Sequence, residues 1–165
     1  MTTAGGALRL TVDRDEAAVL RRLVAEVRDR LDAEPTPGGQ PDPARARLLP
    51  DAHRDDPALA AAHRDLTEAG LIADKRADAE LVAAQLPVAG GTVELTDPHP
   101  WLRALNDVRL TLGAELAITE DSEPPRQVAT EADLRLSVYF WVTYVQDSLV
   151  SALLALPSDG AGRTW

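Results

Sequence analysis

Apolar and polar residues alternate along two short segments of the chain. Residues 8–12 (Leu-Arg-Leu-Thr-Val) and 92–96 (Thr-Val-Glu-Leu-Thr) each place apolar side chains at every second position, as strands with one solvated face do. A lone strand would leave its backbone groups unpaired, so we expect the two segments to pair with each other. The pattern does not decide between parallel and antiparallel pairing.

Helical spacing of apolar residues dominates the rest of the chain. Asp13 and Glu16 stand three residues apart, the spacing of a capping box, and this predicts a helix that ends before Pro35. A helix is also predicted from Pro57 to Gly70, where the glycine is expected to end or kink it. Three more helices are predicted: from about Ala73 to Leu86, from residues 97–100 to Leu116, and from Thr130 to Leu156. A short helical turn is predicted from Ala44 to Leu49.

These elements predict a mainly α fold: a helical bundle of about five or six helices with a small two-stranded β-pair. The length favours a single domain over residues 1–165. Residues 34–43 are rich in Pro and Gly and are expected to form a flexible linker, and residues 158–165 a disordered tail. The segment 134–156 is the most apolar of the chain and is expected to be the buried central helix. Its aromatic residues, Tyr139, Phe140, Trp141 and Tyr144, are expected to pack in the core.

Composition narrows the classes of partner. The chain has 27 acidic and 17 basic residues and a net charge of −10, which argues against nucleic-acid binding because a phosphate-binding face must be basic. It has no cysteine, so a disulfide framework, a Cys-ligated zinc and a thiol switch are excluded. Polar residues interrupt every apolar run before the length of a membrane span, and the first residues do not resemble a signal peptide. A cytoplasmic protein without a membrane role is expected.

No catalytic motif is present. Phosphate-loop, dinucleotide-binding and nucleophile-elbow patterns do not occur. His53, His63 and His99 form no pair at metal-ligand spacing, and a site built from His53 and His63 with neighbouring acids would need a convergence that the spacing does not supply. We therefore predict no catalytic residue, no metal and no cofactor, and a protein that is not an enzyme.

The last predicted helix carries one polar stripe. Thr143, Asp147 and Ser151 follow one another at four-residue steps, so they face either solvent or the preceding helix. Because a buried polar group needs a partner, we predict an ion pair between Arg109 and Asp147. An alternative function also follows: a small-molecule-binding protein or enzyme with a pocket between the last two long helices, in which Arg109 grips a carboxylate. That pocket or polar core would contain Trp101, Asn106, Arg109, Trp141, Gln146 and Asp147.

Two longer runs carry a family resemblance. They are LLPDAHRDDP at residues 48–57 and WLRALNDVRLTLG at residues 101–113, supported by residues 118–121 (ITED) and 141–150 (WVTYVQDSLV). Together they resemble an actinobacterial family of domains of unknown function that includes the oxidative-stress-responsive regulators AosR. The resemblance covers residues 8–154. It implies a small cytoplasmic protein, of a kind encoded near a Clp-protease adaptor and cysteine-biosynthesis genes.

The resemblance also implies a mode of action, with one departure. The best-described branch of the family binds an alternative sigma factor under oxidative stress through a cysteine pair, and this chain has no cysteine, so a disulfide switch is impossible here. We therefore expect a non-enzymatic regulatory protein that acts through protein–protein interaction, with a sigma factor as the candidate partner. A negative surface suits a basic partner, and the acidic run with Asp51, Arg54, Asp55 and Asp56 is the candidate contact surface. A capped turn between helices explains the same run. A homodimer is also expected from the frequency of twofold assemblies.

Overall fold

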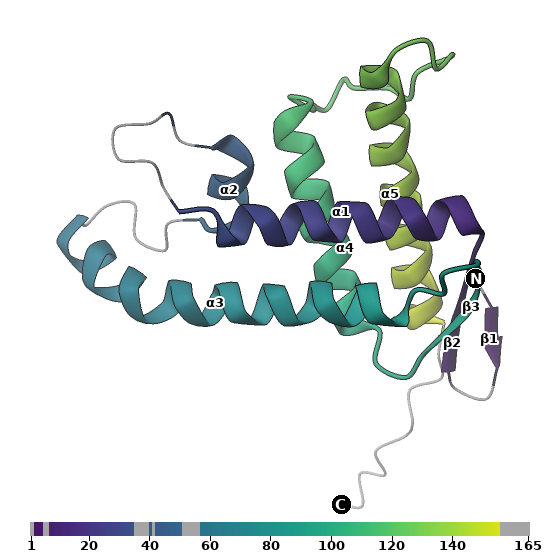
Figure 1. Cartoon of the computed structure of the whole chain (residues 1–165), viewed down its shortest axis with the longest axis horizontal. Helices are drawn as coiled ribbons and strands as arrows, with labels where there is room; N and C mark the ends of the chain where they lie inside the picture. The colour runs from purple at the N-terminus through teal and green to yellow at the C-terminus, as the bar shows by residue number, and fades with distance from the viewer. Residues whose placement is uncertain (1, 5–6, 35–39, 41, 51–56, 156–165) are drawn as a thin grey trace, which may run out of the picture.

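A computed structural model of the chain contains five helices and a small sheet (Figure 1). It describes residues 2–4, 7–34, 40, 42–50 and 57–155, and for residues 2–4, 7 and 57–67 it describes the backbone alone. The elements in chain order are β1 (Thr2–Ala4), β2 (Ala7–Val12), α1 (Arg14–Asp32), α2 (Pro43–Leu48), α3 (Pro57–Gln85), β3 (Gly91–Leu95), α4 (His99–Glu115) and α5 (Glu131–Leu154). The fold is mainly α with a small β component, as predicted.

The two predicted strands pair, and the pairing is antiparallel. Leu8 lies opposite Leu95, and Leu10 opposite Val93. These apolar side chains are buried, whereas Arg9 and Glu94 form an ion pair on the outer face, with Arg9 Nε 2.9 Å from Glu94 Oε1. The alternation in the sequence therefore separates a core face from a solvated face. A third strand, β1, was not predicted; it pairs antiparallel with β2 and gives the sheet order β1-β2-β3.

The capping box predicted at Asp13 is present and fixes the start of α1. The Asp13 carboxylate accepts a hydrogen bond from the Glu16 backbone N–H at 2.8 Å, and the Glu16 carboxylate accepts one from the Asp13 N–H at 2.8 Å. The turn before β3 lies against this cap. Gly90 has a φ of +78°, and a Cβ there would stand 2.7 Å from the Arg14 backbone nitrogen, so only glycine fits between β3 and α1.

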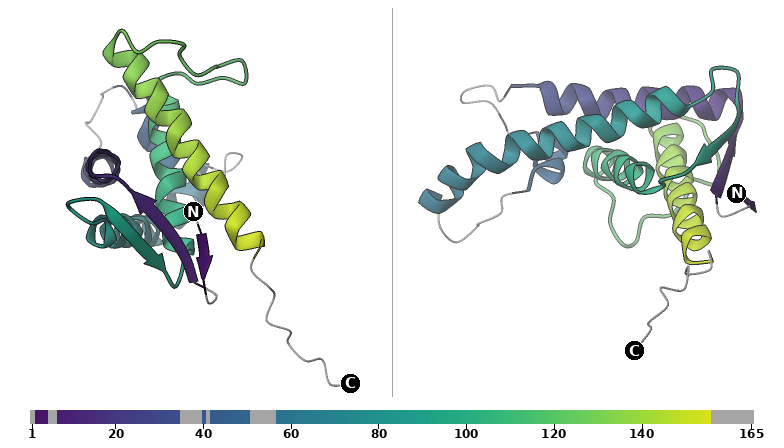
Figure 2. Two further views of the ribbon diagram at one scale, coloured as in Figure 1. Left: turned by 90° about the vertical axis from the view of Figure 1, so that its right-hand side faces the viewer. Right: turned by 90° about the horizontal axis from the view of Figure 1, so that it is seen from below.

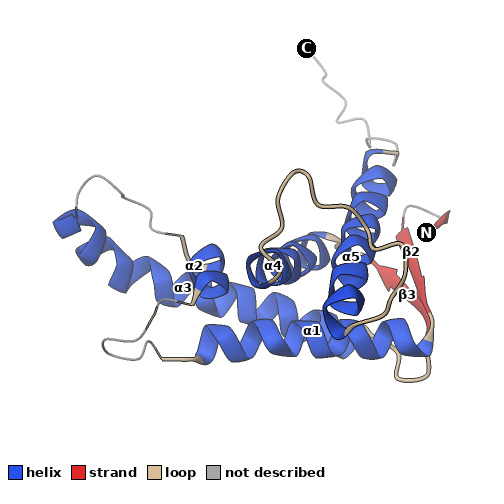
Figure 3. Cartoon of the chain, turned by 90° about the horizontal axis from the view of Figure 1, so that it is seen from above, coloured by secondary structure: helices blue, strands red, loops and turns tan. Residues whose placement is uncertain are grey.

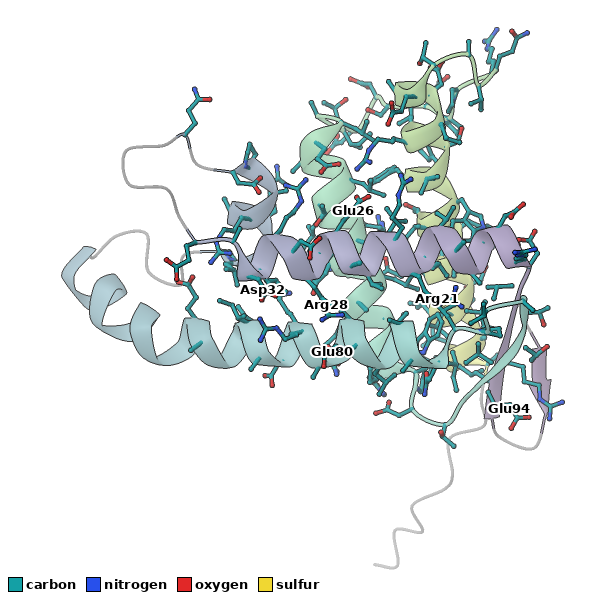
Figure 4. The ribbon with its side chains drawn as sticks, viewed as in Figure 1. Arg21, Glu26, Arg28, Asp32, Glu80 and Glu94 are labelled. Carbon is teal, nitrogen blue, oxygen red and sulfur yellow. The ribbon has the colours of Figure 1, made fainter. Side chains whose placement is uncertain are left out.

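Helices α1 and α3 run side by side in opposite directions (Figure 1). Buried Leu20, Leu23 and Val27 of α1 and Val82 of α3 contribute to one hydrophobic core. Ion pairs join the exposed edges of the two helices. Arg28 Nη2 lies 3.4 Å from Glu80 Oε1 (Figure 4), and an Arg76–Asp32 pair follows farther along the seam.

Helix α4, not α5, is the central helix of the structure. It crosses the α1–α3 pair (Figure 3) and contacts α1, α2, α3 and α5. Trp101 near its start is fully buried and donates an indole hydrogen bond to Gln85 Oε1 at 2.6 Å. The prediction that residues 134–156 form the buried central helix is wrong. Helix α5 packs mainly on α4 from one side (Figure 2), and its fully buried residues are Val142, Val145 and Leu149.

Two further predictions differ from the structure in instructive ways. The chain stays helical through Gly70, so the two helices predicted on either side of it are one, α3. A glycine in a helix costs only about 1 kcal/mol relative to alanine, which the good helix formers around it offset.

Tyr144 is 71% exposed rather than buried in the core. Tyr139 and Trp141 are half-buried and pack against the core.

Two glycine substitutions are expected to change stability in opposite directions. Gly90→Ala should lower the free energy of unfolding by about 1–3 kcal/mol, because φ is positive there and the added carbon would strike backbone. Gly70→Ala should raise it by up to about 1 kcal/mol, because Gly70 is helical and its added carbon meets open space. Urea denaturation measures both. Equal effects of the two variants would contradict the assigned turn.

Candidate functional site

The acidic surface predicted from the sequence lies outside the described residues. Asp51, Arg54, Asp55 and Asp56 belong to a segment that the structure does not describe. The predicted tail at 158–165 and most of the predicted linker at 34–43 lie outside as well. The described part of that linker includes Asp42, which caps α2 by accepting a hydrogen bond from the Ala44 N–H at 2.9 Å. Burial alone would raise the pKa of Asp42, but the hydrogen bond from Ala44 and, after it, the charge of Arg30 lower this pKa below its ordinary value.

The predicted partner of Arg109 is wrong by one residue. Arg109 Nη1 donates to Gln146 Oε1 at 2.8 Å, and Gln146 Nε2 lies 3.5 Å from the Leu102 carbonyl oxygen. Asp147 is exposed to solvent. Successive helical residues differ by about 100° in direction, so a helix that turns Gln146 toward α4 turns Asp147 away. The polar stripe of α5 therefore faces solvent at Asp147 and Ser151, and Thr143 bonds back to the Tyr139 carbonyl at 2.9 Å.

A small cavity lies where the alternative function placed a pocket. Its volume is about 150 Å³, and its lining residues are Arg47, Asn106, Arg109, Leu110, Gly113, Ile118 and Tyr139. Of the six residues predicted there, only Asn106 and Arg109 line it. Trp101 is buried in the core and Trp141 lines a different groove. Small-molecule sites usually have volumes of about 300–1,000 Å³, so this cavity is small for a metabolite.

A larger polar groove separates α3 from α4. It has a volume of about 730 Å³ and contains two ion pairs. Lys75 Nζ lies 2.6 Å from Asp107 Oδ1, and Arg103 forms a two-pronged pair with Asp78 at 2.6 and 2.8 Å. Asp78 and Asp107 are buried. Because each buried carboxylate has its own cation, these pairs join the two helices rather than leaving free charges in the groove.

The surroundings of Asp107 shift its pKa. Burial raises the pKa of its carboxyl above the ordinary value, against the opposing effect of the Lys75 ammonium. Its second oxygen, Oδ2, has no hydrogen-bond partner and is shielded from solvent. The charged form therefore depends mainly on Lys75, with a weaker electrostatic contribution from Arg103, which makes the Lys75–Asp107 pair a sensitive point of the α3–α4 contact.

Helix α5 exposes an apolar face that no described element covers. Leu134 is 52% exposed and Tyr144 71%, and the half-buried Trp141 lies between them on the same side of the helix. Leu154, the last residue of α5, is 81% exposed but points about 160° away from Leu134 around the helix axis. Isolated exposed apolar residues are ordinary on a protein surface, but a helix face that carries several of them marks a surface that binds something.

An apolar groove adjoins this face, between α5 and the start of α1. We call it the α1–α5 groove; its lining residues are Asp13, Asp15, Glu16, Val19, Ser137, Val138 and Trp141, and its volume is about 280 Å³. Val19, Val138 and Trp141 supply the apolar surface, and the three acidic residues come from the first turn of α1 and its cap. In the described part of the chain, no basic side chain forms an ion pair with these three carboxylates.

Some residues of this groove were noticed in the sequence but were given other roles. Trp141 was assigned to the core with the other aromatic residues, and Asp13 and Glu16 were recognised only as a cap. Asp15 and Val19 lie four residues apart and so share one face of α1. The periodicity of α5 could not show which of its faces would meet α1.

The described residues contain neither a candidate metal site nor a candidate membrane span. No group of three or more His, Asp or Glu residues there is arranged to hold a metal ion. None of the helices described is both long enough and apolar enough to cross a membrane.

Comparison with known proteins identifies relatives of the chain. A family model described as a domain of unknown function, DUF2017, matches residues 1–153. The chain is 35% identical over 129 residues to a protein of Mycobacterium leprae named "Putative oxidative stress regulator AosR", in a match that covers 69% of this chain and 59% of that protein. It is 33% identical over 168 aligned residues to the proteins of Mycobacterium bovis and Mycobacterium tuberculosis named "Oxidative stress regulator AosR", covering 92% of this chain and 75% of theirs. No solved structure is significantly similar to the chain.

Adjacent alanine substitutions on α5 should separate the two candidate partners of Arg109. Gln146→Ala is expected to lower the free energy of unfolding by about 1–2 kcal/mol, because the half-buried guanidinium loses its acceptor. Asp147→Ala is expected to change it by less than about 0.5 kcal/mol, because the side chain is solvated. Urea denaturation of both variants tests this. A larger loss for Asp147→Ala would restore the ion pair predicted from the sequence.

Asp107→Asn is expected to change how stability depends on pH. The raised pKa of Asp107 means that the folded state holds this proton more tightly than the unfolded state does. Ionisation of Asp107 therefore lowers the free energy of unfolding of the wild-type protein as the pH rises from the ordinary pKa of 3.8 through the raised pKa of the folded state. Asparagine does not titrate, so the free energy of unfolding of the variant relative to the wild type should increase from about pH 4 upward and then level off.

Urea denaturation at a series of pH values measures this difference. The other carboxyl groups titrate in both proteins and cancel in the comparison. Among them, hydrogen bonds from His99 lower the pKa of Asp97, and hydrogen bonds from Thr130 and Ala129 lower that of Asp133. A difference that is constant over the whole range would contradict the raised pKa of Asp107.

Proposed function

The chain belongs to the DUF2017 family, and we propose that it is a non-enzymatic regulatory protein that acts by binding another protein. The mycobacterial relatives are named oxidative stress regulators, which supports a regulatory role. The proposal places this chain in the cytoplasm and in the response to oxidative stress. Because the chain has no cysteine, its regulation would not use a cysteine switch.

The exposed apolar face of α5 is the observation that carries this proposal. Leu134 and Tyr144, on the same side of the helix, keep half or more of their surface in solvent, and α5 packs mainly on α4. Removing apolar surface from water contributes about 25 cal/mol per Å² toward association, before the entropy that is lost on binding is subtracted. Tyrosine and tryptophan are also the residue types that contribute most at protein interfaces. A partner that lies along α5 would cover both Tyr144 and the neighbouring Trp141.

The partner is proposed to present a basic surface. The chain carries a net charge of −10, and complementary charge speeds association and disfavours partners of like charge. A sigma factor is the proposed partner. The acidic run with Asp51, Arg54, Asp55 and Asp56 remains a proposed second contact.

The alternative, a small-molecule site between α4 and α5, has weaker support. The cavity there measures about 150 Å³, below the usual size of a ligand pocket. A homodimer is the competing use of the α5 face, since a second copy of the chain could cover the same residues.

Pull-down from the native host should identify the surface that the partner uses. We expect the double variant Leu134→Ser, Tyr144→Ser to lose captured protein by at least about tenfold, since two interface residues of this kind contribute about 1 kcal/mol or more each. Val88→Ser is the matched control, because Val88 is 80% exposed and lies in the turn before β3 rather than on α5. The triple variant Asp51→Ala, Asp55→Ala, Asp56→Ala tests the acidic contact separately.

The outcomes distinguish the competing surfaces. Loss in the α5 variant with retention in the Val88 control supports the α5 face. An unchanged set of captured proteins in the triple variant removes residues 51–56 from consideration. Light scattering that gives two chains per particle for the wild type and one for the α5 variant would assign the face to a homodimer instead. Equal capture by all variants would contradict the proposed α5 surface.

A further inference from the structure

The surface of the α1–α5 groove is mainly apolar, and three acidic residues are among those that line it. Val19, Val138 and Trp141 provide the floor, and three acidic residues line the groove at the start of α1. Asp13 and Glu16 each use one carboxylate oxygen in the capping box, Oδ1 and Oε2 respectively, so each keeps a second oxygen. Asp15 is exposed and has no side-chain hydrogen bond among the residues described.

This combination matches the chemistry of one side chain. Arginine has an aliphatic stem that packs on apolar surface and a planar guanidinium that stacks on an aromatic ring. The guanidinium can also donate two parallel hydrogen bonds to a carboxylate. The groove volume of about 280 Å³ suits one side chain rather than a whole metabolite.

We infer that the α1–α5 groove binds an arginine side chain of the partner protein, with its guanidinium on Trp141 and beside the carboxylates of Asp13, Asp15 and Glu16. This inference rests on the proposed function, which supplies the protein partner. It adds the chemistry by which that partner is recognised. The carboxylates at the start of α1 then have two roles, since they cap the helix and select a basic residue.

The neighbouring residues of α5 indicate how the partner would continue. Leu134 lies one turn before the groove residues Ser137 and Val138, and Tyr144 lies nearly one turn after Trp141. Both are more than half exposed. A partner segment along α5 would therefore place apolar residues on either side of the arginine. In such an arrangement the arginine fixes the register, and the apolar contacts supply most of the buried area.

Titration of the purified full-length chain with short peptides tests the inference. The probes are tetra-arginine, tetra-lysine and tetra-citrulline amides, and the readout is the indole N–H resonance of Trp141, which the spectrum of Trp141→Phe identifies. We expect tetra-arginine to shift this resonance saturably, with a Kd about three- to fivefold lower than that of tetra-lysine. Tetra-citrulline, which has a similar shape without the charge, should have no effect. The resonance of the buried Trp101 should not move.

Two variants of equal charge separate the groove from general attraction to an acidic protein. Asp15→Asn and Asp147→Asn each remove one exposed carboxylate, but only Asp15 lines the groove. Asp15→Asn should raise the Kd for tetra-arginine about threefold or more, and Asp147→Asn should leave it nearly unchanged. Both residues are exposed, so both variants should keep the fold, and far-UV circular dichroism checks this.

Three results would overturn the inference. They are the absence of a saturable Trp141 shift, an equal affinity for arginine and lysine peptides, and equal weakening by the two variants. The test needs no captured partner, so it can fail while the pull-down succeeds. In that case the α5 face would bind its partner without an arginine in the groove. Binding of arginine by a chain that captures no protein would leave the groove in place and contradict the proposed function alone.

Discussion

The burial of α4 among four other helices is the constraint on which the rest of the structure depends. Trp101, Leu105 and Val108 are fully or almost fully buried, and α1, α2, α3 and α5 all contact the helix that carries them. A helix surrounded in this way organises a single core. It also leaves α5 with one covered side, because α1 and α3 already occupy much of the surface around α4. The exposed apolar residues of α5 and the groove beside α1 both follow from this arrangement.

Local features of the sequence predicted local structure well. The Asp13–Glu16 spacing predicted the cap of α1, and the alternation at residues 8–12 and 92–96 predicted the strand pair, because each depends on side chains close in sequence or on one face of a strand. Gly70 misled the prediction because its helical penalty is small beside the stability of a 29-residue helix. The strand β1 was missed because three residues are too few to show alternation.

The site was less predictable because it depends on which helix faces meet. Apolar content predicts that a helix such as α5 packs against something, but it does not predict how many neighbours the helix has. The sequence therefore placed Tyr144 and Trp141 in a core, whereas the structure exposes the first and places the second at a groove. The sequence pattern also could not show whether Gln146 or Asp147 faces Arg109, because both are polar and they are adjacent on the helix.

The pairing of Lys75 with Asp107 has a chemical consequence, because this is the only lysine in the chain. Acylating reagents, and enzymes that conjugate tags to lysine, must reach the amine, and this amine lies 2.6 Å from a buried carboxylate in the groove between α3 and α4. With only 17% of its side chain exposed, Lys75 is also poorly accessible. A fluorophore ester would therefore react slowly with Lys75, and lysine-directed turnover of the folded protein would first require α3 to separate from α4.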